Sequence, residues 1–508
     1  MNLRLPQRKA LEIVARSQPR EIYLVGGFVR DTLLGRESAD IDLGVPGEPP
    51  KAMAIARRVA NQHRWESLGY RVSPFSLDSV FGVARVVFTP LNEESQEKGF
   101  YLDVAVLGGD NIQTDLAQRD FTVNALALPL DKFLAADGTL PLEEVLETPG
   151  GKADLKGQII RPIGEKNLQA DPLRMLRGIR LRAQLSSKTS PWEFADGTLD
   201  LFKKHCTLIN RSAAERVREE LTKTWLAGDV AHSLQLLEEC DLLMRLIPEL
   251  KDDTHNSFRK TVNLIERLEG LITPTEFSEK NQGIAHPEKF IKGWSEMLAD
   301  LEANGRERLG ILYWATLLSN TANFCQEALT PTNEAEVAHK IMTRLRFSRE
   351  TTVRVAAIVQ HQAWIEELGQ DFDLTSGKDV DKLAAYRFLR DTQPIQFELF
   401  VLSLVRYAVA NSTNNLRGWE QHLALVDSLL RKYKGNAEER LIGKPRLIEG
   451  KQLTGLLNLN PGPLVGQLLR KINEAQAIGQ IHTSEEALEL ANQLLEELKL
   501  LETAPSGD

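Results

Sequence analysis

Near its N-terminus the chain reads Ile22-Tyr-Leu-Val-Gly-Gly-Phe-Val-Arg-Asp-Thr-Leu-Leu-Gly35 and then Asp40-Ile-Asp-Leu43. The apolar run that opens at Ile22 is typical of a buried strand. Gly26-Gly27 ends that strand and leaves no Cβ in the way of a ligand. Residues 28–34 have helical spacing and stop at Gly35. A strand, two glycines and a helix N-terminus together favour phosphate binding, because free N–H groups and the helix dipole point outward.

Asp40 and Asp42 lie two residues apart on the next predicted strand, so their carboxylates face the same way. Apolar Ile41 and Leu43 flank them and face the other way. Two like charges held together are unfavourable unless a divalent cation lies between them. Oxygen ligands beside a phosphate site therefore favour Mg²⁺.

These residues resemble the signature of the class II tRNA nucleotidyltransferases, the family of CCA-adding enzymes and bacterial poly(A) polymerases. The head domain of that family carries a Gly-Gly-x-x-Arg-Asp…Asp-x-Asp motif. The matching residues here are Gly26, Gly27, Arg30, Asp31, Asp40 and Asp42. The resemblance implies a polymerase-β-like head in which Asp40 and Asp42 are catalytic and hold Mg²⁺, while Gly26, Gly27 and Arg30 bind the nucleotide.

Asp103 is an acid within the apolar strand predicted over residues 100–107. Taken alone, it could be an edge-strand charge that faces water. The resemblance favours a third catalytic carboxylate beside Asp40 and Asp42, since an acid on this strand completes the catalytic set of the family.

A second motif follows, Arg119-Asp-Phe-Thr-Val-Asn-Ala125, and its alternating pattern predicts a strand over 121–127. It resembles the family's Arg-Arg-Asp-Phe-Thr-x-Asn-Ala, from which it departs at Gln118. The resemblance implies that Arg119 binds the nucleotide and that Asp120 and Asn124 shape its pocket. The link over 108–114 is short, whereas many members that can add the terminal A have a longer flexible loop there.

Residues 170–185 have the pattern of a helix with Pro172 in its first turn. Its charged residues recur every third position, which places three of them on one broad face and the last at its margin. These residues are Asp171, Arg174, Arg177 and Arg180. A solvated helix face explains such a pattern as well as a base-reading one does.

The same helix resembles the family's Glu-Asp-x-x-Arg motif, in which side chains select C or A. By resemblance Asp171, Arg174, Arg177 and Arg180 contact the incoming nucleotide. Ala170 replaces the Glu that steadies the selecting arginine in relatives. Further along, segment 211–221 carries a Glu-Arg-x-x-x-Glu run, which in the family braces the neck against the head.

The predicted fold class is α+β, an N-terminal nucleotidyltransferase head followed by an all-α neck, body and tail. We expect the head over 1–135, the neck over 136–250, the body over 251–435 and the tail over 436–508. The neck is expected to select nucleotides and bind RNA, and the tail to bind tRNA. The body faintly resembles an HD-type domain, but Ser319-Asn320 stands where the metal-binding His-Asp pair would be, so we interpret it as a degenerate HD-like scaffold.

Length and composition set further bounds. At 508 residues the chain is too long for one core. It shows no apolar run of transmembrane length and no signal-peptide core, so no membrane partner is expected. Three widely spaced cysteines, Cys206, Cys240 and Cys325, are typical of the reducing cytoplasm. A net charge of −9 argues against a uniformly basic nucleic-acid binder but permits a local basic groove.

The resemblance implies an RNA nucleotidyltransferase that works without a template. It would add C and/or A to the 3′ end of tRNA from CTP and ATP and release pyrophosphate. Complete CCA, CC alone, A alone and poly(A) all stay open as products, and oligomeric state is not predicted. Outside the enzyme class, the alternative is a catalytically inactive RNA-binding protein, which the retention of Asp40, Asp42, Asp103 and Arg119 disfavours.

Overall fold

The computed structural model describes most of the chain. The described ranges are 3–17, 21–61, 64–92, 99–136, 141–187, 189–250, 256–272, 286–302, 306–321, 334–411 and 416–503. The chain divides into two compact units, one of Met1–Ala227 with Ser233–Leu246 and the other of Gly228–His232 with Ile247–Asp508. Each unit is described by itself.

The first unit contains a mixed sheet. Within the described residues seven strands follow the order β3-β4-β5-β2-β1-β6-β7. Their bounds are β1 (Tyr23–Val25), β2 (Asp40–Val45), β3 (Tyr70–Asp78), β4 (Val83–Pro90), β5 (Phe100–Val106), β6 (Leu126–Pro129) and β7 (Leu146–Glu147). The pair β2–β5 is parallel, and the other pairs are antiparallel.

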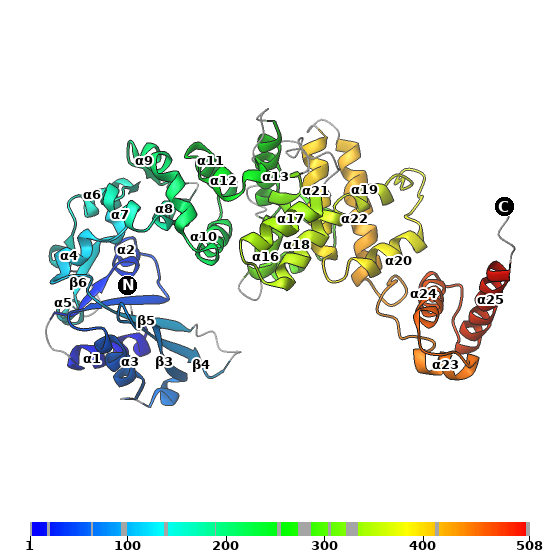
Figure 1. The fold of residues 1–508 in the computed structure, drawn as a ribbon, viewed down its shortest axis with the longest axis horizontal. Coiled ribbons are helices and arrows are strands. Elements are labelled where there is room, and N and C mark those ends of the chain that lie inside the picture. The colour runs from blue at the N-terminus through cyan, green and yellow to red at the C-terminus, as the bar shows by residue number, and fades with distance from the viewer. Residues whose placement is uncertain are drawn as a thin grey trace. The chain divides into compact units, whose positions relative to one another are not determined.

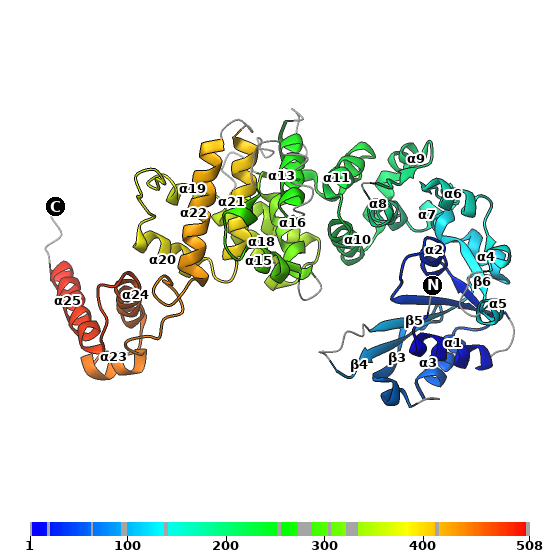
Figure 2. The ribbon, with the colours of Figure 1, turned by 180° about the vertical axis from the view of Figure 1, so that it is seen from behind.

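The two faces of this sheet differ in chemistry. On β2 the alternate residues Ile41, Leu43 and Val45 are buried, and Leu102 of β5 lies opposite Ile41 on the same face. The helices α1 (Leu5–Ser17) and α3 (Pro50–Asn61) pack on this apolar face, and both views show them together against the sheet (Figures 1 and 2). The opposite face of the same strands is therefore left for Asp40 and Asp42.

Short elements surround the sheet and lead into helices. Those of the first unit are α2 (Gly27–Leu33), η1 (Trp65–Leu68), α4 (Ile112–Ala117), η2 (Thr122–Asn124), α5 (Leu130–Ala135), η3 (Leu142–Glu144), α6 (Gly151–Gly157), α7 (Glu165–Ala170), α8 (Leu173–Leu185), α9 (Thr198–His205), η4 (Cys206–Arg211), α10 (Ala214–Ala227) and α12 (Leu242–Leu246). α11 (Val230–Glu239) contains residues of both units. Two short parallel strands, β8 (Ile159–Ile160) and β9 (Glu193–Phe194), lie among these helices. The apolar run over 159–163 predicts a short strand, which β8 confirms at its start, whereas β9 lies in a stretch that was expected to be helical.

The strand predicted over 121–127 is wrong in its first half. Residues Thr122–Asn124 form the turn η2, and β6 begins only at Leu126. Side-chain hydrogen bonds compete with the strand here, because Thr122 Oγ1 donates to Asp154 Oδ2 at 2.8 Å. The turn also presents the Asn124 side chain to Arg30, whose Nη1 donates to Asn124 Oδ1 at 2.6 Å.

The helix predicted over 170–185 begins later than expected, at Leu173. Asp171 has extended backbone angles, φ −136° and ψ 92°, and joins α7 to α8. The residue before a proline avoids the helical conformation, and Asp171 precedes Pro172. The periodicity predicted Asp171 on the same helix face as Arg174 and Arg177. The structure contradicts this, because Asp171 lies outside α8.

The second unit is helical throughout its described residues apart from turns and short 3₁₀ segments. Its elements are η5 (Pro248–Leu250), α13 (Asn256–Ile272), η6 (Pro287–Lys289), α15 (Trp294–Glu302), α16 (Glu307–Leu318), α17 (Glu334–Arg344), α18 (Arg349–His361), α19 (Trp364–Leu368), α20 (Lys382–Asp391), α21 (Gln396–Ala410), α22 (Leu416–Lys434), α23 (Gly450–Leu457), α24 (Pro463–Ile478) and α25 (Ser484–Thr503). α16 and α21 are buried on nearly all sides. Ser319 caps the end of α16, and its hydroxyl donates to the Thr316 carbonyl at 2.8 Å.

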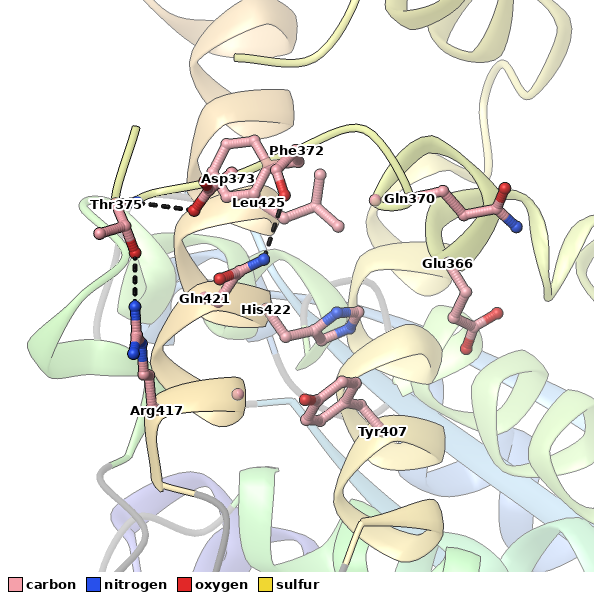
Figure 3. Close-up of a pocket in the computed structure, with 12 residues that line it drawn as sticks. Glu366, Gln370, Phe372, Asp373, Thr375, Tyr407, Arg417, Gln421, His422 and Leu425 are labelled. Carbon is pink, nitrogen blue, oxygen red and sulfur yellow. Dashed lines mark hydrogen bonds between the residues drawn. The ribbon is translucent and has the colours of Figure 1, made fainter. Parts of the chain in front are cut away.

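A cavity of about 600 Å³ opens in this unit beside α21 and α22. Figure 3 shows the rings of Tyr407 and His422 side by side at its wall, and their centroids are 4.3 Å apart. His422 Nε2 is hydrogen-bonded to Ser403, and burial lowers the pKa of His422 to about 4. The histidine is therefore a neutral, stacked part of the core at physiological pH.

The predicted fold class, an α+β head followed by helices, is confirmed. Among the described helices, none is both long enough and apolar enough to cross a bilayer. Cys206 and Cys240 are free, buried thiols, and Cys325 lies outside the described residues.

The last three helices share a hydrophobic cluster of their own and are tied to α20 by one buried acid. Glu474 of α24 accepts hydrogen bonds from Arg387 at 2.8 and 3.0 Å and from Arg390 at 2.9 Å. These guanidinium contacts, led by that of Arg387, lower the pKa of Glu474 to about 2. Because this value lies below the ordinary 4.5, the carboxylate stabilises the fold above about pH 4.5 and loses that effect as pH falls toward 2.

We predict that Glu474→Gln lowers the free energy of unfolding of the second unit by about 1–3 kcal/mol at pH 7. The difference from the unchanged protein should shrink as pH falls below about 4.5. Urea unfolding at several pH values measures it, with the exposed acid Glu485→Gln as the matched control. A pH-independent difference would contradict the assignment.

Candidate active site

Gly26 and Gly27, here called the glycine elbow, lie close to the catalytic candidate Asp42 and to the nucleotide-binding candidate Arg119. Gly26 has φ +66°, and a Cβ at this position would meet Arg119 Nη1 at 2.9 Å and Asp42 Oδ2 at 3.8 Å. Neighbouring Gly27 would place a Cβ 3.6 Å from Arg30 Nη2 and 3.9 Å from Asp42 Oδ2. The two glycines therefore allow the backbone to approach both an acid and two arginines.

The acids of the predicted catalytic set lie on neighbouring strands. Asp42 on β2 is directly opposite Asp103 on β5, and Asp40 is opposite Tyr101. Burial, together with the charges of Asp103 and Asp40, raises the pKa of Asp42 to about 6. Partial desolvation is also the main cause that raises the pKa of Asp40. Burial and the neighbouring acids therefore both disfavour the ionised form of Asp42.

Arg85, which the sequence reading did not single out, holds the third acid. From β4 it donates Nε and Nη2 to the two carboxylate oxygens of Asp103, each at 2.7 Å, and its guanidinium lies 4.7 Å from the ring centroid of Tyr101. The hydrogen bond to Asp103 raises the pKa of Arg85. Within the described residues no three His, Cys, Asp or Glu side chains are grouped to hold a metal ion. Arg85 pairs with both oxygens of Asp103, whereas no such arginine pairs with the side chain of Asp40 or Asp42 among the described residues.

A hydrogen-bonded chain connects the elbow to the second motif. Arg30 is paired with Asp31, Nε to Oδ1 at 2.8 Å, and its Nη1 reaches Asn124 at 2.6 Å. Asn124 Nδ2 in turn donates to Asp120 Oδ1 at 3.3 Å, and buried Asp120 also accepts from Arg177 Nη1 at 3.4 Å. The structure thus joins Arg30, Asn124, Asp120 and Arg177 in one network.

Asp115 anchors Arg119 and the preceding link at the same time. Its Oδ2 accepts from Arg119 Nε at 3.0 Å, and its Oδ1 accepts from the Gly108 amide at 2.8 Å. Asn111 caps α4 by accepting from the Thr114 amide at 3.0 Å. The short connection after β5 is therefore closed by local hydrogen bonds.

The arginines of α8 are held by a buried acid of α10. Glu220, 6% exposed, lies 3.0 Å from Arg180 Nη1 and 3.7 Å from Arg177 Nε. Burial lowers the pKa of Arg180, whereas for Arg177 the charges of Asp120 and Glu220 outweigh burial and raise the pKa. Both guanidinium groups remain cationic, and Glu220 keeps them side by side.

Arg174 and Asp171 have different partners from those of Arg177 and Arg180. Arg174 Nη1 donates to the carbonyl oxygens of Arg119 and Asn167, each at 3.2 Å. Burial lowers the pKa of Arg174. Asp171 Oδ2 accepts from Arg216 Nη2 of α10 at 3.0 Å. Arg174 therefore lies beside the second motif through the carbonyl of Arg119, whereas Asp171 contacts α10.

Four residues that contact the candidate site were missed by sequence reasoning, namely Arg85, Asp115, Arg216 and Glu220. Asp115 carried a readable signal, since an acid four residues before Arg119 on a helix predicts an ion pair. Arg216 and Glu220 belong to a run interpreted only as a brace. Arg85 gave no local signal, because its partner becomes evident only once β4 pairs with β5.

Two segments match known sequence families. Residues 22–161 match the family described as "Poly A polymerase head domain". Residues 193–254 match the family described as "Probable RNA and SrmB- binding site of polymerase A". The first segment contains the elbow, the acids and the second motif described above.

Known proteins resemble the chain over nearly its whole length. The A-adding tRNA nucleotidyltransferase of Deinococcus radiodurans is 28% identical over 491 residues, which cover 94% of this chain and 96% of the relative. A CC-adding tRNA nucleotidyltransferase of Thermus thermophilus is 30% identical over 488 residues, 92% of each chain. The Bacillus stearothermophilus CCA-adding enzyme in complex with CTP has the same fold, with a TM-score of 0.60 at 19% identity over 98% of this chain and 100% of that one. Sequence identity of this extent confirms the resemblance drawn from the motifs, and the chain belongs to the tRNA nucleotidyltransferase family.

Proposed function

We propose that this chain adds C and/or A to the 3′ end of tRNA from CTP and ATP, without a nucleic-acid template, and that pyrophosphate is released. One observation carries the proposal: Gly26 brings the backbone against both Asp42 and Arg119. The acids and the nucleotide-binding arginines thereby share one site, as nucleotidyl transfer requires. The names of the relatives in Deinococcus and Thermus agree with this reaction class.

Asp40 and Asp42 are proposed to hold Mg²⁺. Burial, together with the charges of Asp103 and Asp40, raises the pKa of Asp42 to about 6, and a divalent cation relieves such a buried cluster of like charges. Mg²⁺ commonly takes one or two carboxylates and completes its ligands with substrate phosphates, so a third protein acid is not needed. Held by Asp40 and Asp42, such an ion would lower the pKa of the RNA 3′-hydroxyl and stabilise charge on the leaving pyrophosphate. Asp103, held by Arg85, adds negative charge beside the pair.

The remaining predicted residues are proposed to bind and select the nucleotide. Gly26, Gly27 and Arg30 lie beside Asp42 and suit the triphosphate. Arg119 faces the same elbow, and Asp120 and Asn124 order the network behind it. On the far side of that network Asp171 offers an acceptor and Arg174 a donor to the base edge, with Arg177 and Arg180 next to them on α8.

A partial activity, CC or A addition, is proposed ahead of complete CCA synthesis. Two features support it. The link after β5 is short and closed by Asn111 and Asp115, where longer loops accompany terminal A addition in the family, and this favours CC addition over complete CCA synthesis. Ala170 also leaves Arg174 without the carboxylate that relatives provide. Poly(A) synthesis is the alternative product that the assay below distinguishes.

We further propose that the head (1–135) carries the chemistry and that the neck (136–250) selects the nucleotide and binds RNA. The body (251–435) would then be a degenerate HD-like scaffold, and the tail (436–508) would contact tRNA. The buried free thiols Cys206 and Cys240 support a reducing, cytoplasmic setting.

The product is tested with purified protein and tRNAs that end before C, after C and after CC, each offered CTP or ATP. A CC-adding enzyme extends the first two with CTP only, whereas an A-adding enzyme extends only the third, with ATP. Extension of the first two tRNAs with CTP and also of the third with ATP would indicate complete CCA synthesis and would contradict the partial activity. Long A tracts would identify a poly(A) polymerase, and no extension of any tRNA would refute the proposed function.

Asp42→Ala should abolish nucleotide incorporation and leave tRNA binding nearly unchanged, because the acid lies at the metal and triphosphate side of the site. Gel-based extension and filter binding measure the two properties separately. Full incorporation by this variant would remove the metal assignment.

Asp42→Asn should stabilise the metal-free protein. A carboxyl whose pKa is raised from 3.8 to about 6 destabilises the fold once ionised, by at most about 3 kcal/mol above pH 6. The gain should grow between about pH 4 and pH 6 and then level off. Urea unfolding in EDTA measures it, with exposed Asp110→Asn as control. Added Mg²⁺ should reduce the difference in free energy of unfolding between Asp42→Asn and the unchanged protein. Equal stability of these two proteins at pH 8 without Mg²⁺ would contradict the unfavourable burial of charge at Asp42.

Arg174→Ala should blur or abolish the choice between C and A, since it removes the donor of the selecting pair. The ratio of kcat/KM for CTP and ATP on the tRNA that the unchanged enzyme extends is the measurement. A preserved ratio would refute the selecting role of Arg174.

A further inference from the structure

Helix α10 presents two opposite charges to the α8 region, one turn apart. Arg216 and Glu220 are four residues apart and therefore lie on one face of the helix. Glu220 pairs with the arginines of α8, whereas Arg216 donates Nη2 to Asp171 Oδ2 at 3.0 Å. One face of α10 thus supplies an acid, Glu220, to the α8 arginines and a cation, Arg216, to Asp171.

The Asp171 carboxylate is oriented from two directions. Its Oδ1 accepts from the Leu173 amide at 3.3 Å, and its Oδ2 accepts from Arg216. A carboxylate has about four acceptor positions, so lone pairs remain for a base edge. The orientation depends on Arg216, because Asp171 itself lies in an extended junction and not in a helix.

One donor of Arg174, its Nε, is buried and makes no hydrogen bond among the described residues. The Nη1 of Arg174 contacts the two backbone carbonyls named above. Position 170, at the end of α7, is an alanine and offers no carboxylate. The Asp171 charge acts on Arg174 and is therefore within electrostatic reach of it.

We propose that Arg216 is a positioning residue for nucleotide selection, which holds the Asp171 carboxylate apart from Arg174 so that acceptor and donor both remain available to the incoming base. This rests on the proposed function, in which Asp171 and Arg174 read the base. Without Arg216, the Asp171 carboxylate turns to the free Nε of Arg174. The two side chains then satisfy each other, and neither reads the nucleotide.

The test compares Arg216→Ala with Arg216→Lys, which keeps a positive charge at the same place. Arg218→Ala is the matched control: it removes the same charge from the same helix, but the neighbour of Arg218 there is Glu219. Three properties are measured for each full-length protein: CTP and ATP affinity without tRNA, kcat and KM for each nucleotide on the tRNA that the unchanged enzyme extends, and the melting temperature.

Arg216→Ala should weaken binding of the preferred nucleotide about tenfold, which corresponds to about 1.4 kcal/mol. The ratio of kcat/KM between CTP and ATP should move toward one, mainly through KM. Arg216→Lys should restore part of both effects. Since Arg216 is 52% exposed, its ion pair contributes little to stability, and the melting temperature should stay close to that of the unchanged protein.

Unchanged nucleotide affinity and selectivity in Arg216→Ala would overturn the inference, as would equal losses in Arg218→Ala. A fall in melting temperature that Arg216→Lys restores together with selectivity would mark Arg216 as a structural brace and would also overturn it. If the unchanged protein extends no tRNA, the proposed function fails. The affinities measured without tRNA then still decide whether Arg216 positions the nucleotide-binding pair.

Discussion

The placement of Asp42 opposite Asp103 on two parallel strands is the constraint on which the site depends. The register between β2 and β5 places these two carboxylates side by side. Because side chains alternate between the two faces of a strand, Ile41 and Leu43 point into the core on the side of α1 and α3. The strand cannot relieve the repulsion by turning, because a one-residue slip would bury both acids and expose the core. The cost appears in the raised pKa of Asp42 and in the need for Arg85. Free energy from the apolar face therefore maintains a charge arrangement that is unfavourable by itself.

Around this cluster the site is built from side chains that belong to different elements. The turn η2 carries Asn124 to Arg30, and α10 meets α8 with Arg216 and Glu220. Almost every polar group that would face a nucleotide is thus held by a second polar group behind it. Such an arrangement reduces the reorganisation that binding requires. Arg174 is the exception, since it is held by backbone carbonyls and keeps an unpartnered donor.

Local patterns were sufficient to predict the elements that carry the motifs. The elbow at Gly26 and the strand of Asp40 follow from residue types and period alone, and the structure has both. Prediction was wrong where side chains override the backbone pattern, as at Thr122, whose hydroxyl bonds to Asp154 and ends the expected strand. It was also wrong where Pro172 excludes Asp171 from the helix. Partners such as Arg85 could not be predicted, because their proximity depends on strand pairing between distant segments.

The position of Asp115 has a consequence for how members of such a family can diverge. One carboxylate fastens both the Gly108 amide and the Arg119 guanidinium. An insertion between β5 and α4 displaces the Gly108 amide. Asp115 can then no longer accept from that amide and from Arg119 in the same position. The length of this loop and the position of the Arg119 side chain are consequently not independent, and a longer loop grafted into this scaffold alters the support of that arginine.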